Sequence, residues 1–407
     1  MQSQRLRSAG LLTIVALGTL LRMLYALRTP YWMHAYDWQG HHQYIRFLFE
    51  NGHLPAATFG WETFQPPLYY VLCALWLKYT AFLGFGYGSL QIISVTMSIM
   101  TLLVGLWIGT ILFSKNDTGA LIFGLLIAVF PGLIVLSSQI TNDGLLTLLL
   151  FIVIGLLLRW KESKRTRDVM AASVVLGLAL LTKSTALLLL PVLALSILTA
   201  ANISWKRRVA VFGGSIILIT IIAGWFFVLR FGIEGQTSIV GNDSSTHELI
   251  TVPLRLRDFV TFNPFTTIHF PFTDDLTTPR REILFEHLFK TAHFGHHYFV
   301  PMRLASLLLL SGIGMLVMML IGMRSHHLRG RMMLLSICAV MIIGIVLHRF
   351  HTPSVANEDF RFIVPIIIPI IAFSVHAAIE SRRKYAPIAL IGTYASLCFV
   401  VVLRFLS

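Results

Sequence analysis

Two aspartates that lie outside the apolar runs of this sequence are its candidates for acid–base chemistry. Asp37 follows the first apolar run, and Asp143 lies between two later runs, in Asn142-Asp143-Gly144. A carboxylate held within hydrogen-bond reach of a hydroxyl can act as its general base. Aspartate is also a preferred N-cap, so each has a structural alternative: Asp37 as the cap of the helix that follows it, and Asp143 as the cap of a helix beginning at Gly144. The two could also share a divalent metal ion, although no carboxylate cluster demands one.

Two cations lie in short segments next to apolar runs, where they could bind phosphate. Lys183 stands in Thr182-Lys183-Ser184, a tight turn between two runs, and Arg361 stands at the mouth of a late run, close to Glu358 and Asp359. The planar fork of arginine suits phosphate, and Glu358 would lie in the same site. The alternatives are a lysine that reaches ordinary lipid headgroups and an arginine in an interfacial ion pair.

The segment after Asp37 predicts a short interfacial helix that ends at Asn51-Gly52. Ile45, Leu48 and Phe49 fall on its apolar face. Its polar side carries three candidate substrate-binding residues, His41, His42 and Arg46.

Three further candidate substrate-binding residues follow in the same loop: Glu62, Gln65 and Tyr69. They belong to the stretch from Phe59 to Tyr70, which contains Gln65-Pro66-Pro67 and is rich in aromatic side chains. For a single Trp or Tyr, the alternative is an ordinary aromatic belt at the membrane interface.

Histidines and cysteines give weaker signals. His293, His296 and His297 are close enough to bind a metal, but Gly295 interrupts the helix that would align them and no nearby acid completes a site. The three cysteines, Cys73, Cys338 and Cys398, all lie inside apolar runs, which argues against disulfides and against a zinc cluster.

The composition defines the elements that must position these residues. Of 407 residues, 56% are apolar and only 12% are charged. This excludes a soluble globular enzyme and a disordered chain, because soluble domains carry about twice that charged fraction. Unbroken apolar runs of about 20 residues exclude a transmembrane β-barrel, whose strands are short and alternating. The fold class is therefore an all-α polytopic membrane protein.

The sequence contains twelve apolar runs. They are 9–27, 66–83, 89–113, 119–137, 144–158, 169–182, 184–200, 209–229, 301–323, 332–348, 362–380 and 386–403. The net charge of +14 comes largely from short basic clusters between runs, which the positive-inside rule places in the cytoplasm. For all these basic clusters to lie on the cytoplasmic side, one of the twelve runs must not cross the membrane. The run 66–83 opens with two prolines and carries Lys78, so we expect it to be re-entrant or interfacial.

The predicted topology has about 11 transmembrane helices in a single membrane-embedded domain, 1–407, with the N-terminus inside. Two long loops lie outside the cytoplasm, 28–88 and 231–300, and both should contain interfacial helices. Long ordered loops usually carry function, so chemistry is expected at the outer face. The sequence contains no Walker loop, nucleophile elbow, HExxH or CxxC motif.

The order of these motifs resembles one family. Asp37, the interfacial helix, Gln65-Pro66-Pro67-Leu-Tyr-Tyr, Asn142-Asp143, Gly-Leu-Ala-Leu-Leu-Thr-Lys183 and Asn-Glu-Asp-Phe-Arg361 follow one another as in the integral-membrane GT-C glycosyltransferases. The resemblance is to the branch (glycosyltransferase family 39-like) that holds protein O-mannosyltransferases and bacterial aminoarabinose transferases. It covers nearly the whole chain and implies a GT-C-like bundle.

The resemblance implies roles for individual residues. Asp37 matches the catalytic base of the family, Asp143 matches its second-loop aspartate, and Lys183 matches a lysine that contacts the lipid phosphate. Family members often carry a second acidic residue beside the base, whereas here Trp38 follows Asp37. This difference leaves the roles of His41 and His42 open.

The resemblance also implies a function in the cell envelope. The expected enzyme is an inverting hexosyl- or pentosyltransferase that moves a sugar from a polyprenyl-phosphate donor to a hydroxyl of a lipid, glycan or protein. The absence of any added soluble domain and the modest length favour a prokaryotic inner-membrane enzyme whose active site faces outward. The alternatives are a transporter or flippase of a lipid-linked glycan, and a glycan ligase or polymerase. Nucleic acid is not an expected partner.

Overall fold

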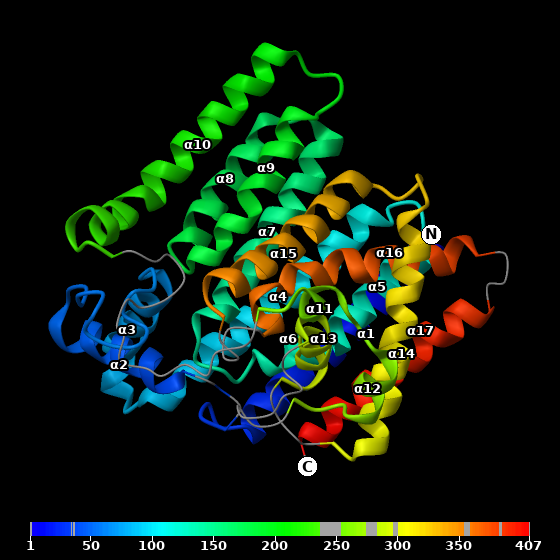
Figure 1. Cartoon of the computed structure of the whole chain (residues 1–407), viewed down its shortest axis with the longest axis horizontal. Coiled ribbons are helices and arrows are strands. Elements are labelled where there is room, and N and C mark those ends of the chain that lie inside the picture. The colour runs from blue at the N-terminus through cyan, green and yellow to red at the C-terminus, as the bar shows by residue number, and fades with distance from the viewer. Residues whose placement is uncertain are drawn as a thin grey trace. The chain divides into compact units, whose positions relative to one another are not determined.

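The computed structural model describes residues 2–33, 35, 37–236, 254–273, 283–295, 300–353, 359–381 and 385–406, without the side chains of residues 2–6. Within these ranges the regular structure is entirely helical (Figure 1). The chain forms two compact units. Unit 1 comprises 1–28, 105–135 and 248–407, and unit 2 comprises 29–104 and 136–247.

Among the described residues, seven helices are long and apolar enough to cross a membrane. They cover Arg7–Arg28, Tyr87–Leu112, Asn142–Ser163, Trp205–Ile233, Met302–Met323, Arg331–His351 and Tyr385–Phe405. Four shorter apolar helices accompany them, over Leu68–Leu83, Asp117–Val129, Ser184–Leu198 and Val364–Glu380. The protein is thus an integral membrane protein, and the predicted all-α polytopic fold class is confirmed.

Unit 2 holds the helices between residues 38 and 104 and those around Asp143 and Lys183. They are α2 (Trp38–Asn51), α3 (Leu68–Thr80), η1 (Ala81–Leu83), η2 (Tyr87–Leu90), most of α4 (Gln91–Leu112), α7 (Asn142–Ser163), α8 (Thr166–Leu180), η3 (Ser184–Leu188), α9 (Leu189–Leu198), α10 (Trp205–Phe227) and η4 (Val228–Ile233). Helix α8 packs against both α7 and α10, as Figure 1 shows. Helix α3 has 13 residues, fewer than the roughly 20 that a crossing needs.

Unit 1 holds the N-terminal helix and the C-terminal bundle. Its helices are α1 (Gln2–Arg28), α5 (Asp117–Val129), α6 (Pro131–Val135), α11 (Leu256–Val260), α12 (Pro264–His269), α13 (Leu284–Phe294), α14 (Met302–Met323), α15 (Arg331–His351), η7 (Phe360–Phe362), η8 (Val364–Ile366), α16 (Ile367–Glu380) and α17 (Tyr385–Phe405). Helix α14 packs closely on α16, where Gly322 lies so near the backbone of Phe373 that a β-carbon would clash.

The predicted single run over 119–137 is wrong, because Pro131 divides it into α5 and α6. Proline lacks an N–H, so the Ile127 carbonyl has no intrahelical donor. The guanidinium of Arg22, fully buried in α1, donates to the freed carbonyls of Ile127 and Ala128 at 3.4 and 3.0 Å. A buried arginine in the first membrane helix therefore stabilises the break.

Helix α2 ends where the sequence predicted, at Asn51, with Gly52 in the left-handed conformation at φ 72°. The predicted faces are partly wrong. His41 lies on the buried face with Ile45 and Leu48, whereas Phe49 is 44% exposed. The buried face of α2 includes His41 because its ring has a hydrogen-bond partner in α3. This polar side chain can therefore be buried without losing its hydrogen bonding.

Candidate functional site

A buried ion pair lies at the centre of unit 2. The ammonium of Lys183 lies 2.6 Å from Oδ1 of Asp143, and the two side chains are 8% and 1% exposed. Asp143 is in the first turn of α7, where the helix dipole stabilises a carboxylate. The cap position is occupied by Thr141, so Asp143 is not the N-cap. Two of the predicted site residues, 40 positions apart in the sequence, thus form one charged pair.

Backbone contacts fix the segment that carries Lys183. The chain leaves α8 at Leu180, and Lys183 is extended before η3 begins at Ser184. The Leu181 carbonyl accepts from the N–H of Leu68 at 2.8 Å, and the Thr182 carbonyl accepts from the Asn142 amide at 3.2 Å. The start of α3 and the start of α7 therefore both hold the lysine turn in place.

Side chains of α2 and α3 extend this buried polar cluster. Nδ1 of His41 lies 2.9 Å from the hydroxyl of Tyr70, and the amide of Asn142 lies 3.5 Å from the same hydroxyl. Tyr44 stacks on Tyr70 with ring centroids 4.0 Å apart and donates to the Gln65 carbonyl at 3.3 Å. The cluster thus links α2 and α3 to Asn142, the sequence neighbour of Asp143.

The other predicted binding residues of the first loop are also buried. Glu62 and Gln65 are 6% and 7% exposed, and Tyr69 is fully buried in α3. Glu62 packs so closely under α2 that a β-carbon at Gly40 would lie 2.8 Å from its Cγ atom. A buried carboxylate beside a polar cluster is costly unless it is paired or functional.

Asp37 stands at the start of α2 in an unusual backbone conformation. Its φ is 59°, in the left-handed region, which non-glycine residues seldom adopt. It occupies the N-cap position, yet its side chain makes no capping hydrogen bond. Its carbonyl accepts from the N–H of His41 at 3.1 Å. The backbone therefore places this carboxylate at the N-terminal end of α2, where it does not serve as a capping group.

His42 lies in an aromatic group distinct from the buried cluster. Its ring centroid is 3.9 Å from that of Tyr87, and Trp38 and Tyr31 continue the group with centroids 5.7 Å apart. Partial burial, and then the charge of Arg46, lower the pKa of His42. Arg46 itself is paired with Glu50 at 2.7 Å on the exposed side of α2. His41 and His42 thus face different surroundings.

A second buried cation, missed from the sequence, holds the loop before α3. Arg230 is fully buried in η4, where it pairs with Glu234 at 2.6 Å. It also donates to the carbonyls of Pro55 and Thr63 at 3.1 and 2.8 Å. The only sequence signal was an arginine four residues before a glutamate at the end of an apolar run. Arg230 also lines a cavity of about 10 Å³, together with Phe64, Pro66, Ser184, Phe226, Phe227, Phe231 and Gln236.

The predicted residues near position 360 belong to unit 1. Asp359 caps η7 by accepting from the N–H of Arg361 at 2.9 Å, and the Arg361 guanidinium lies 5.3 Å from the centre of the Phe362 ring. The N–H of Phe360 donates to Thr291 of α13 at 3.1 Å. Glu358 lies outside the described residues.

Metal ligation finds no support among the described residues, which contain no group of three His, Cys, Asp or Glu side chains able to hold an ion. Both ring nitrogens of His293 are engaged, one with the Phe289 carbonyl at 2.8 Å and one with the Tyr394 hydroxyl at 2.9 Å. His296 and His297 lie outside the described residues. The three cysteines are free and buried.

Comparison with known proteins relates this arrangement to membrane glycosyltransferases. Residues 65–226 match the sequence family "Dolichyl-phosphate-mannose-protein mannosyltransferase". A search of curated proteins gives no significant match.

Two solved structures share the fold. The first is ArnT from Cupriavidus metallidurans bound to undecaprenyl phosphate, with 13% identity and a TM-score of 0.60 over 97% of this chain and 76% of that one. The second is the archaeal oligosaccharyltransferase AglB from Archaeoglobus fulgidus, solved with an inhibitory peptide and a dolichol-phosphate. It has 13% identity and a TM-score of 0.58 over 96% of this chain and 55% of that one.

The family match contains Tyr70, Asn142, Asp143 and Lys183, four residues of the buried polar cluster. At these identities the structural likeness establishes the fold. The resemblance of this chain to the GT-C glycosyltransferases of the protein mannosyltransferase and aminoarabinose transferase branch is therefore confirmed, by the sequence pattern of residues 65–226 and by the fold.

Proposed function

We propose that the protein is an inverting glycosyltransferase that moves a sugar from a polyprenyl-phosphate donor to an acceptor hydroxyl. The observation that carries the proposal is the buried Asp143–Lys183 pair, which lies within the segment matching the mannosyltransferase family. The fold neighbours were solved with undecaprenyl phosphate and with a dolichol-phosphate, which supports a lipid-phosphate donor.

Asp37 is the proposed general base. The acceptor hydroxyl attacks the anomeric carbon on the face opposite the phosphate, the bond from that carbon to the phosphate oxygen breaks, and the hydroxyl proton passes to Asp37. The products are the glycoside and the polyprenyl phosphate. A carboxylate positioned at the start of α2 suits this role, and such a base contributes about 10²–10⁴-fold.

Lys183 is the proposed phosphate ligand. Cations that meet the charge developing on a leaving group lower the barrier. Asp143 holds the Lys183 ammonium at 2.6 Å, so the pair positions this cation in a buried site. Arg361 is the second candidate cation. His41, His42, Arg46, Glu62, Gln65, Tyr69 and Glu358 are the remaining proposed substrate-binding residues.

A divalent ion at Asp143 fits this geometry poorly. The ammonium of Lys183 is 2.6 Å from the carboxylate oxygen that an ion would need, and two cations at that distance repel. Unchanged activity of the purified protein after treatment with a chelator is the expected result.

Transfer of an oligosaccharide is a second candidate, because one fold neighbour is an oligosaccharyltransferase. The acceptor is a hydroxyl of a lipid, glycan or protein at the extracytoplasmic face of a prokaryotic inner membrane. Mass spectrometry of lipid extracts and surface glycans, from cells with and without the gene, distinguishes a single sugar from an oligosaccharide. The result expected is an accumulated lipid-phosphate monosaccharide and a missing glycan substituent.

The decisive test uses purified protein in detergent with a polyprenyl-phosphate sugar and an acceptor extract. An enzyme transfers the sugar without a sealed membrane, whereas a transporter or flippase shows no reaction under these conditions. Transfer by the wild type that is lost in Asp37→Asn supports the proposal. Equal transfer by both proteins would remove Asp37 from the mechanism.

A further inference from the structure

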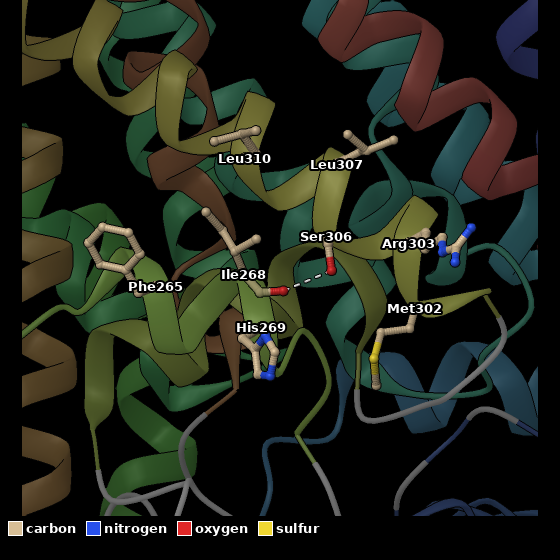
Figure 2. A pocket seen from close by; sticks show the side chains of 8 residues that line it. All are labelled: Phe265, Ile268, His269, Met302, Arg303, Ser306, Leu307 and Leu310. Carbon is tan, nitrogen blue, oxygen red and sulfur yellow. Dashed lines mark hydrogen bonds between the residues drawn. The ribbon is translucent and has the colours of Figure 1, made fainter.

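The outer surface of unit 1 carries a groove between α12 and α14 that the proposed reaction does not use. Its volume is about 610 Å³, within the usual range for ligand sites. It is lined by Phe265, Ile268, His269, Met302, Arg303, Ser306, Leu307 and Leu310 (Figure 2). Ser306 fixes the two helices to each other by donating to the Ile268 carbonyl at 2.8 Å.

The walls of the groove are apolar and exposed. Phe265 is 84% exposed, and Leu307 and Leu310 are each 53% exposed. Helix α14 is one of the candidate membrane spans, so this face meets lipid chains. Leu256 and Val260 of α11 are also strongly exposed, at 78% and 69%, although α11 is too short to span. Exposed apolar side chains on short helices beside a span are typical of segments that enter the membrane interface.

The groove also has a cationic end. Arg303 lies at the start of α14 and His269 at the end of α12, and Figure 2 shows the two side chains pointing away from each other. Both side chains are exposed, and neither is hydrogen-bonded or ion-paired with another described residue. A fixed positive charge at one end of an apolar groove on a membrane helix is complementary to one class of ligand, a lipid whose headgroup carries an anionic phosphate.

We propose that this groove binds an anionic glycerophospholipid of the surrounding leaflet. Arg303 holds its phosphate, and one acyl chain lies over Phe265, Leu307 and Leu310. The groove shares no residue with the Asp143–Lys183 cluster, and its occupancy does not depend on glycosyl transfer. By the predicted topology, it faces the outer leaflet, where a positive side chain at a helix end is not required by the positive-inside rule.

The test is native mass spectrometry of the full-length protein in detergent, titrated with phosphatidylglycerol or with phosphatidylcholine. Wild type should bind its first phosphatidylglycerol more tightly than its first phosphatidylcholine. Arg303→Gln should weaken phosphatidylglycerol binding about 5-fold, the scale of one partly exposed charge contact, and weaken phosphatidylcholine binding less, because the choline cation offsets the charge of that lipid's phosphate. Arg324→Gln is the matched control, because Arg324 is also exposed and lies at the other end of α14.

A second pair of variants tests the apolar walls. Leu310→Trp should fill the groove and weaken binding of both lipids, whereas Leu320→Trp, on an equally exposed position of α14 outside the groove, should change neither. Equal affinity of the wild type for the two lipids would overturn the proposal, as would equal losses in Arg303→Gln and Arg324→Gln. Arg303-dependent displacement of phosphatidylglycerol by an equal concentration of undecaprenyl phosphate would assign the groove to a prenyl lipid instead.

Discussion

Lys183 and Asp143 form an ion pair of 2.6 Å that is almost completely buried. A buried pair is a poor source of stability compared with apolar residues of the same size, but removing one partner strands the other charge. Such a pair is retained where a charge is needed at that place. The proposed function gives this pair such a use, with Lys183 as the ligand of the donor phosphate.

Breaking this pair should cost far more stability than breaking an exposed one. We expect Lys183→Met to lower the free energy of unfolding by about 3–5 kcal/mol, because Asp143 would be left charged and buried. Arg46→Gln, which breaks the exposed pair with Glu50, should leave the unfolding temperature almost unchanged. Thermal unfolding in detergent measures both.

The double variant Asp143→Leu with Lys183→Met separates stability from function. With both charges removed, the unfolding temperature should recover most of the loss, whereas glycosyl transfer should remain absent. Recovery of transfer along with stability would show that the pair has only a structural role.

Asp37→Asn should abolish transfer without affecting folding. Asparagine tolerates the left-handed backbone at φ 59°, has the same shape, and leaves no capping hydrogen bond to be lost. We expect a fall in rate of about 10²–10⁴-fold with an unchanged unfolding temperature. Initial rates with a polyprenyl-phosphate sugar measure the fall in transfer rate. A fall in unfolding temperature that accounts for the lost activity would contradict this role.

The stability of unit 1 should depend on pH through His293, which lies in α13 outside the candidate spans. Complete burial lowers the pKa of His293 from 6.5 to about 4, opposed in part by its hydrogen bond to the Phe289 carbonyl. The unfolded state therefore binds a proton that the folded state rejects. Stability is complete above pH 6.5 and falls as the pH drops toward 4, by about 3 kcal/mol in all.

The His293 effect is measured as the change in unfolding temperature between pH 7 and pH 4.5. His293→Gln should be less stable than the wild type at pH 7, because it disrupts the bonds to Phe289 and Tyr394. Its stability should nevertheless vary less with pH. The same pH dependence in both proteins would mean that other groups are responsible.

Arg230 should control the order of the loop before α3. Arg230→Met removes the donors to Pro55 and Thr63 and leaves Glu234 with the N–H of Ala57 but without its cation, so we expect a loss of about 2–3 kcal/mol. Limited proteolysis should then cut between residues 55 and 63 faster than in the wild type. Arg207→Met, at an exposed arginine on α10, is the control and should leave that cleavage rate unchanged.

The sequence predicted those features that depend on local signals. Helix α2 ends at Asn51 because Gly52 readily takes a left-handed conformation, and the apolar runs identify the membrane helices by length. Pro131 was also visible, but hydropathy alone did not reveal the break, because α6 continues the apolar pattern beyond it.

Long-range pairing explains what could not be predicted. Neither Asp143 nor Lys183 carries a local signal for a partner 40 residues away, and His41 was assigned to the polar side because its partner Tyr70 lies in another helix. Arg230 was missed for the same reason: its carbonyl partners precede it by 167 and 175 residues.

The long sequence separation between Arg230 and its two carbonyl partners determines when their hydrogen bonds can form during biosynthesis. Pro55 and Thr63 leave the ribosome long before Arg230 does, so their carbonyls wait without this donor until α10 has been made and inserted. The loop that carries Asp37 and Glu62 is thus completed late, after Asp143 and Lys183 have already been synthesised. Nascent chains truncated before position 230 should expose this loop to protease, and a chain that includes Glu234 should protect it.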